Sequence, residues 1–327
     1  MEINLQNLNA LFYGFNTIFQ RGFDKPPTYY DRLATIVPSS ASRELYPWLG
    51  RTTAFREWLG DRMIQALERH GYTIVNRDFE NTVAVDRNDI EDDTYGILTP
   101  MFEQLGWDAK VHPDTLLFGL LKAAVQNIDS PSTAGAIVGY DGSTFFSRTG
   151  HPVGKAGGKS TATPNCDPAN GSAPFWYLVD VSRPIRPFIV QKRKEYQFVR
   201  MNTPTDEAVF MRREFRFGVD ARLNTGVSFW QLAYASNQDL SNSNTYANAI
   251  GNMRSIKTDA GVPFGAAYMM DAANMKLLVP PALEEVGRRL LHAELVAGGA
   301  GGRAGSQDPQ SNVWMNSAEL IVSPYLA

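Results

Sequence analysis

Apolar residues recur every three or four positions near the start of the chain, and this spacing predicts an amphipathic helix over residues 5–23. Gly14 lies within that segment and costs about 1 kcal/mol relative to alanine, so the helix needs a partner surface to form. Pro26 and Pro27 end it. The pattern leaves two interpretations open: an aromatic arm that packs on another surface, or an ordinary N-terminal core helix.

Two Trp-Leu-Gly units open the next segment, which runs to Gly96 and contains a predicted short helix over residues 56–70. Apolar residues then alternate with polar ones on either side of a polar centre at 76–81, which predicts two strands. The alternating residues are Tyr72, Ile74, Val83 and Val85. A hairpin with so little apolar content cannot bury a core of its own. We therefore expect it to project from the body or to lie on a neighbour.

An acid run follows this hairpin, and its last members, Asp92 and Asp93, are suited to cap the start of a helix. Apolar residues at helical spacing predict a helix that begins near Thr99, and Pro113 predicts the start of a second, separate helix. Residues 132–175 are rich in Gly, Ser, Thr, Pro and Asn, which predicts a long irregular insertion.

The rest of the chain is β-rich. Strands are predicted over four segments, the last of them central because both of its faces are apolar: 175–181, 188–201, 209–219 and 228–235. Pro280 and Pro281 precede a helical pattern, and the last ten residues predict a closing strand.

Composition narrows the class of protein. The 327 residues carry a net charge of −3, which gives no global attraction to nucleic acid or to membranes. The single cysteine, Cys166, excludes an intrachain disulfide and the paired-thiol metal sites. The N-terminus lacks the pattern of a signal peptide, and no apolar run is long enough to predict a transmembrane helix.

Three motifs suggest chemistry, and each falls short of its consensus. Residues 154–160 resemble a phosphate-binding loop, but Val153 occupies the place of the first glycine, and no apolar strand precedes it. In an EF-hand loop counted from Asp86, Ile90 would stand at a position that needs an oxygen ligand. The four histidines have no metal-ligand spacing. We expect no catalytic residue, cofactor or metal; a soluble hydrolase or nucleotide-binding enzyme that uses Cys166 or Lys159 is the alternative.

Basic residues gather between Lys192 and Arg216, interleaved with aromatic ones. They could face nucleic acid, but alternating charges on strands are more typical of a solvated face. If the chain lines a container of DNA, neutralisation of phosphates without regard to sequence would suffice.

Several segments, in one order along nearly the whole chain, together resemble the major head subunit of Mu-like phages. The resemblance is carried by LFYGFNTIFQRGFD, WLG…REWLGDR, GYTIVNRDFENTVAVDRNDIEDDTYG, HPDTLLFGLLKA, FWYLVDVSRPIRPFIVQKRK, FMRREFRFGVDAR and AELIVSPYL. It implies the α+β Hong Kong 97-type capsid fold. By this analogy the chain divides into an N-terminal arm (1–45), an extended loop (46–90), a spine helix with the start of a peripheral domain (91–130), and an axial domain with returning peripheral strands (131–327).

The resemblance also implies a function. We expect a structural subunit, not an enzyme, that forms pentamers and hexamers in an icosahedral shell around double-stranded DNA. The shell would belong to a virion and would assemble in the bacterial host cytoplasm. Expected partners are other copies of the chain, a separate scaffold or protease, a portal, and decoration proteins; no covalent crosslink and no membrane are expected. A cellular compartment shell or a prophage-derived particle is the alternative.

Because the arm and the loop show the same shortage of partner surface, we expect them to contact neighbouring subunits. The candidate contacts are Phe12, Phe15 and Phe19 in the arm, and Trp48, Trp58, Arg62, Arg77 and Asp78 in the loop.

Overall fold

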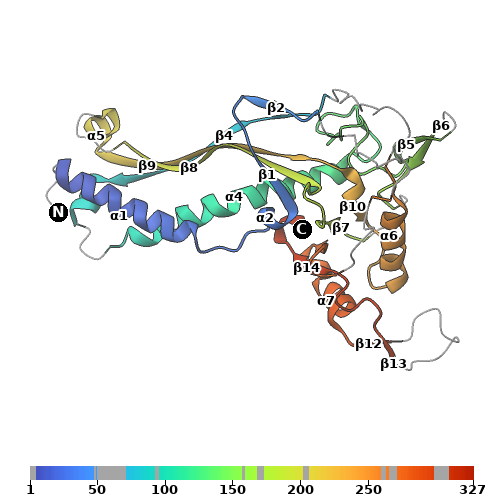
Figure 1. The fold of residues 1–327 in the computed structure, drawn as a ribbon. Coiled ribbons are helices and arrows are strands. Elements are labelled where there is room, and N and C mark those ends of the chain that lie inside the picture. The colour runs from blue at the N-terminus through green and yellow to red at the C-terminus, as the bar shows by residue number, and fades with distance from the viewer. Residues whose placement is uncertain are drawn as a thin grey trace, which may run out of the picture.

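The computed structural model describes residues 5–47, 49, 71–92, 96–156, 159–167, 173–201, 206–258, 263–264, 271–297 and 309–327. Figure 1 shows an elongated half, at the left, joined to a broader half at the right. Strands and helices occur in both halves, as expected for the α+β class.

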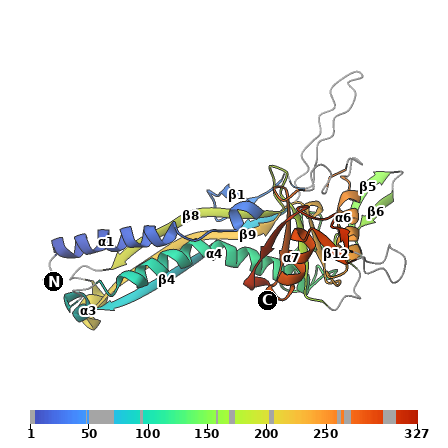
Figure 2. The same cartoon turned by 90° about the horizontal axis from the view of Figure 1, so that it is seen from below.

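The elongated half is a helical layer on one face of a long sheet (Figures 1 and 2). The sheet has the order β1-β8-β9-β4, in which β4, β9 and β8 are antiparallel and β1 runs parallel to β8. Its strands are β1 (Ala34–Pro38), β4 (Arg77–Asp86), β8 (Phe188–Met201) and β9 (Glu214–Val227). The helices are α1 (Leu5–Phe23), α2 (Tyr30–Leu33), α3 (Arg87–Asp92), α4 (Thr99–Gln126) and α5 (Glu207–Arg212).

The broader half is built on a second sheet, of order β10-β7-β11-β14. Its strands are β7 (Trp176–Asp180), β10 (Ala233–Ser236), β11 (Met275–Val279) and β14 (Glu319–Val322); α6 (Ser243–Ser255) and α7 (Glu284–His292) pack on it. Short 3-10 helices span Trp230–Leu232, Pro281–Leu283 and Pro324–Leu326. Three strand pairs complete the described part: β2 (Arg43–Leu45) with β3 (Thr73–Val75), β5 (His151–Ala156) with β6 (Lys159–Thr163), and β12 (Leu295–Ala297) with β13 (Pro309–Ser311).

The two helices predicted around Pro113 are one continuous helix, α4, so that boundary is wrong. Proline is unfavourable in a helix interior because it cannot donate the backbone hydrogen bond of that position. Here Pro113 is buried, and the next residue, Asp114, accepts hydrogen bonds from the backbone nitrogens of Tyr29 (3.0 Å) and Tyr30 (2.6 Å). Packing on both sides of Pro113 therefore outweighs the tendency of proline to interrupt a helix.

The predicted hairpin around 76–81 is also wrong, because its two strands do not pair with each other. β3 pairs with β2, whereas β4 pairs along its whole length with β9. The low apolar content of β4 suits an edge strand, since only one of its faces is covered. The acid run does not start a helix at Asp92, which instead ends α3; Asp86 caps that helix by accepting a hydrogen bond from the Asn88 nitrogen at 2.7 Å. Asp93 and the helix predicted over 56–70 lie outside the described residues.

Two strand predictions need correction. The strand predicted over 209–219 starts only at Glu214, because Val209 and Met211 belong to α5, which ends at the left-handed residue Arg213 (φ 58°). The strand predicted to be central, β10, lies at the edge of its sheet and is buried by neighbouring segments. The other predicted strands and the helix after Pro281 are confirmed, with small shifts of boundary.

The backbones of helices α1 and α4 are in contact where the two helices cross. A Cβ atom added to Gly22 would lie 2.0 Å from the Glu103 carbonyl oxygen, and one added to Gly106 would lie 2.1 Å from the Phe19 carbonyl oxygen. Only glycine permits so close an approach. Glu103 beside the crossing forms ion pairs with Lys25 and Arg21; the hydrogen bond from Lys25 is the main cause of the lowered pKa of this carboxyl group.

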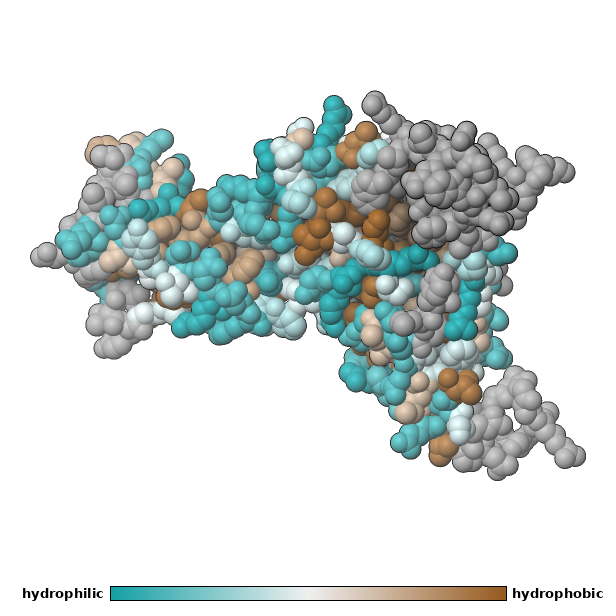
Figure 3. All heavy atoms as spheres, viewed as in Figure 1, coloured by the Kyte–Doolittle hydropathy of each residue, from teal (hydrophilic) through white to brown (hydrophobic). Residues whose placement is uncertain are grey.

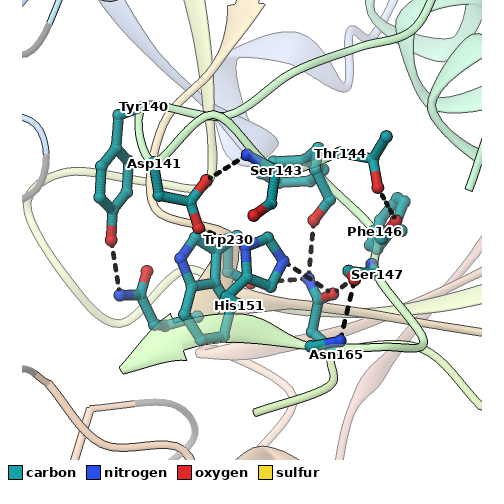
Figure 4. A network of polar contacts seen from close by, with 12 residues as sticks. Tyr140, Asp141, Ser143, Thr144, Phe146, Ser147, His151, Asn165 and Trp230 are labelled. Carbon is teal, nitrogen blue, oxygen red and sulfur yellow. Dashed lines mark hydrogen bonds and ion pairs between the residues drawn. The ribbon is translucent and has the colours of Figure 1, made fainter. Parts of the chain in front are cut away.

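The insertion after α4 is irregular, as predicted, except for the strand pair β5 and β6, and a buried polar cluster ties it to the body (Figure 4). The side-chain nitrogen of Asn165 donates to the carbonyl oxygens of Phe145 (2.9 Å), Trp230 (3.2 Å) and Ala233 (3.2 Å). Its side-chain oxygen accepts a hydrogen bond from the Ser147 nitrogen at 2.9 Å. One amide therefore joins the insertion to the segment that precedes β10.

His151, the first residue of β5, extends this cluster. Its ring stacks on Trp230 with centroids 3.9 Å apart and is 0% exposed. Nδ1 lies 2.6 Å from an oxygen of Asp141, and Nε2 lies 3.2 Å from the side-chain oxygen of Asn165. The ring is thus held on both edges and on one face.

Replacing Asn165 by alanine should remove these bonds and leave buried carbonyl groups unpaired. We expect Asn165→Ala to lower the free energy of unfolding by about 3 kcal/mol, measured by urea denaturation of the unassembled subunit. Asn88→Ala, at an exposed position on α3, is the control and should change it by less than about 0.5 kcal/mol. Equal stability of the two variants would contradict the anchoring role of Asn165.

The crossing of α1 and α4 makes a second prediction. Gly106→Ala should push the helices apart and destabilise the subunit by about 2 kcal/mol. A Cβ atom added to Gly14 in α1 would meet nothing within 4 Å, so Gly14→Ala should stabilise the same helix by about 0.5–1 kcal/mol. Chemical denaturation of both variants measures the difference; a Gly106 variant as stable as the Gly14 variant would exclude the tight crossing.

Candidate assembly surfaces

The apolar face of α1 is covered within its own subunit. Phe15 and Phe19 are buried: Phe15 stacks on Phe102 of α4 (centroids 3.9 Å apart), and Phe19 stacks on Phe198 of β8 (5.4 Å). Phe12, half-buried, also stacks on Phe198, at 5.4 Å. The expectation that the arm finds no partner surface in its own subunit is therefore wrong, because α4 and the sheet provide one. Contacts of these three phenylalanines with another subunit stay a prediction.

Of the candidate residues in the loop, the structure describes Arg77 and Asp78; Trp48, Trp58 and Arg62 lie outside the described residues. Arg77 and Asp78 open β4, an edge strand of the long sheet. The guanidinium of Arg77 lies 5.5 Å from the centroid of the Phe79 ring. Asp78 lies 3.2 Å from Arg222 of β9, yet its side chain is 79% exposed and stays accessible to a partner.

The long sheet has β1 at one edge and β4 at the other, and among the strands that the structure describes neither has a partner on its outer side. Such an edge presents backbone N–H and C=O groups that can pair with another chain. Charged residues along β4, among them Asp78, Glu80 and Asp86, restrict which partners can approach.

Large apolar side chains are exposed at the two extremities of the molecule. At the far end of β8 and β9, α5 presents Phe210 (80% exposed) and Met211 (70%). Figure 3 shows apolar patches among polar ones in the lobe that carries β12 and β13 in Figure 1. In and next to this strand pair, Leu295 faces solvent and Val313 is 80% exposed. Sequence reasoning missed Phe210 because the strand pattern over 209–219 concealed the helix. Exposed residues of this kind commonly mark interfaces.

The described residues offer no arrangement suited to catalysis. Cys166 is buried, and burial raises the pKa of its thiol to about 12, so it stays protonated at neutral pH. The His151–Asp141 pair resembles part of a catalytic triad, but Asn165 occupies the position of the nucleophile. No group of three or more metal-ligating side chains occurs in the described part of the chain.

The near-match to a phosphate-binding loop has the wrong structure. Its two ends form neighbouring antiparallel strands, with Ala156 paired to Lys159, rather than a strand followed by a helix. The enzyme alternative built on Lys159 or Cys166 therefore has no support in this geometry. Among the helices that the structure describes, none is long and apolar enough to span a membrane.

Relatives of this chain are capsid proteins. The family model described as the Mu-like prophage major head subunit gpT matches residues 8–326. The major head subunit of the Mu-like prophage FluMu of Haemophilus influenzae is 37% identical over 89% of this chain and 90% of that protein. The major capsid protein of Escherichia phage Mu is 34% identical over 100% of both chains.

Solved structures agree with these relatives. A chain of the procapsid of bacteriophage JBD30 is 33% identical and superposes with a TM-score of 0.78, covering 99% of this chain and 100% of that one. A chain of the JBD30 capsid is 25% identical, with a TM-score of 0.70 and full coverage of both chains. The α+β capsid fold expected from the sequence is thereby confirmed. This chain belongs to the Mu-like prophage major head subunit family and is a structural capsid protein, not an enzyme.

Proposed function

We propose that the chain assembles with copies of itself, as pentamers and hexamers, into an icosahedral shell that encloses double-stranded DNA. The observation that carries this proposal is the superposition on the JBD30 procapsid chain over nearly the full length of both chains. The exposed sheet edges and the apolar extremities supply surface for contacts with several neighbours at once.

The state of assembly is part of the proposal. The TM-score is higher for the JBD30 procapsid chain (0.78) than for the two capsid chains (0.70 and 0.69). We take the described conformation to correspond to a procapsid subunit.

Further partners are proposed besides copies of the chain. One JBD30 capsid structure is decorated with minor capsid protein trimers, and a comparable decoration protein is proposed here. A separate scaffold or protease and a portal complete the proposed set, with assembly in the bacterial host cytoplasm and the finished shell in the virion.

Contact with DNA is proposed to be non-specific. The basic residues of β8 and β9 give it little support, because several are already paired within the sheet. The pairs are Lys192 with Glu195, Lys194 with Asp220, Arg216 with Glu214, and Arg222 with Asp78. A face neutralised in this way does not act as a dedicated phosphate-binding surface.

Electron microscopy and size-exclusion chromatography of the purified chain test the proposed function. We expect closed icosahedral particles, formed by the chain alone or with its scaffold. Nuclease-protected DNA in particles from infected or induced cells separates a genome container from an empty cage. A chain that stays monomeric under every salt and scaffold condition would refute the shell.

Charge reversal at Asp78 tests the proposed contact in the loop. Asp78 is exposed and makes one ion pair, so Asp78→Lys should change the free energy of unfolding by less than about 1 kcal/mol. Because Asp78 is proposed to lie at a contact between subunits, reversal of its charge should reduce the yield of particles about tenfold. Glu285→Lys is the matched control, since Glu285 is an exposed carboxylate with one ion pair on α7. Normal particle yield from the Asp78 variant would remove this residue from the interface.

A further inference from the structure

A cavity of about 250 Å³ opens between α4 and the long sheet, beside β4. Residues of α4, β4 and β9 and one residue of β8 line it. For comparison, an apolar cavity of about 150 Å³ binds benzene. The space is therefore large enough for a molecule of one or two fused rings.

The walls of the cavity are mainly apolar, and both layers contribute to them. The apolar wall residues are Phe79 of β4, Leu105 and Ala109 of α4, and Val219 and Ala221 of β9. The two alanines are buried, and their short side chains leave the space beside them unfilled. Apolar walls with a few polar groups among them are the usual form of a site for a small molecule.

A neutral polar pair lies among these walls. Nδ1 of His112 is 2.7 Å from the hydroxyl oxygen of Tyr196, and no described residue forms a hydrogen bond with Nε2 of the same ring. Burial lowers the pKa of His112 and raises that of Tyr196, so both side chains are uncharged at neutral pH. Because both residues line the cavity, an occupant can form a hydrogen bond with this pair.

Three aromatic rings meet at the cavity. The His112 ring meets the Phe79 ring edge to face, with centroids 4.5 Å apart. The Tyr196 ring lies at 87° to the His112 ring, with centroids 6.1 Å apart. Aromatic rings attract one another most strongly in edge-to-face or offset-stacked arrangements. An aromatic occupant can meet these rings in the same way, which favours it over an aliphatic one of equal size.

The charges beside the cavity do not favour a charged occupant. The guanidinium of Arg77 lies 5.5 Å from the centroid of the Phe79 ring, and Asp108 of α4 adds an exposed carboxylate to the lining. Glu80 points to the opposite face of β4, where it accepts a hydrogen bond from Thr82 (2.7 Å). One charge of each sign is thus left near the opening. A neutral molecule enters the apolar walls at the lowest cost of desolvation.

We propose that the cavity between α4 and β4 is a binding site for a small, neutral aromatic molecule that carries a hydroxyl group. The rings lie against the apolar walls, and the hydroxyl group forms a hydrogen bond with the His112–Tyr196 pair. A hydroxyl group suits this pair because it both donates and accepts, whichever ring nitrogen holds the proton. The bound molecule contacts the helix and the sheet together, so it stabilises the packing of α4. The site belongs to one subunit and does not depend on a shell.

Isothermal titration calorimetry of the full, unassembled chain with 2-naphthol tests the site. We expect saturable binding with a Kd on the order of 0.1 mM, and a higher unfolding temperature at saturation. The anion 2-naphthoate and the cation 2-naphthylmethylammonium should each bind at least about tenfold more weakly, because a charge would have to lose its hydration. Absence of saturable binding, or equal binding of a charged analogue, would overturn the inference.

Variants of the chain place the binding in the cavity. Ala109→Leu fills the space from the helix side and should abolish binding. His112→Phe keeps a ring but removes its nitrogens, and should weaken the binding of 2-naphthol about tenfold. Ala84→Leu is the control for Ala109→Leu, since Ala84 is exposed on the opposite face of β4, and it should leave binding unchanged.

The unfolding midpoint of each variant without the probe shows whether that variant folds. The two cavity variants act on different features, so either one suffices if the other does not fold. Binding at full strength in a folded Ala109→Leu or His112→Phe variant would show that the probe lies elsewhere, and would overturn the inference.

Discussion

The packing of α4 on the β4-β9-β8 face is the contact on which the rest of the elongated half depends. Alternate residues of β9 point toward the helix, including Phe215, Phe217 and Val219, and all three are buried. Phe102 of α4 meets Phe217 edge to face at 5.3 Å. This layer provides the surface on which α1 docks.

Strand β8 joins the two halves of the subunit. Its first four residues, Phe188–Gln191, are all buried where the halves meet, whereas the later residues alternate between covered and exposed. Its partner β9 follows it over the same length, with irregularities in register near Lys194. Because β8 and β9 run through both halves as one two-stranded ribbon, they fix the orientation of one half relative to the other. The irregularities in register are places where the ribbon can bend. This property suits a subunit whose angle must adapt to its neighbours in a closed shell.

The buried polar side chains of the described structure stabilise its shape through internal hydrogen bonds. Polar groups that resemble catalytic parts, above all His151 and Asp141, hold an irregular insertion in place. Buried tyrosines such as Tyr234 form internal hydrogen bonds, here to Asp167 at 2.6 Å. The accessible features of the described surface are the sheet edges, the exposed apolar residues at the two ends of the molecule and the charged residues of β4. These are the features that recognition between subunits requires.

Periodicity in the sequence determined most of the elements by itself. The helix over 5–23, the start of α4 near Thr99, the strands of the β-rich region and the closing strand all follow from local spacing of apolar residues. The order of short segments also carried the resemblance to the capsid family. Such properties depend only on residues close together in the chain.

The tertiary structure alone decided which surfaces are covered. Pro113 stays within a helix because packing on both sides holds it there, and β4 pairs with a strand more than a hundred residues away rather than with its neighbour. The aromatic residues of α1 reach α4 only because Gly22 and Gly106 let the two backbones touch. Burial depends on contacts between distant segments, and local spacing does not encode them. For this reason the resemblance of short segments indicated a capsid protein correctly, while the argument that the arm lacks a partner within its own subunit was wrong.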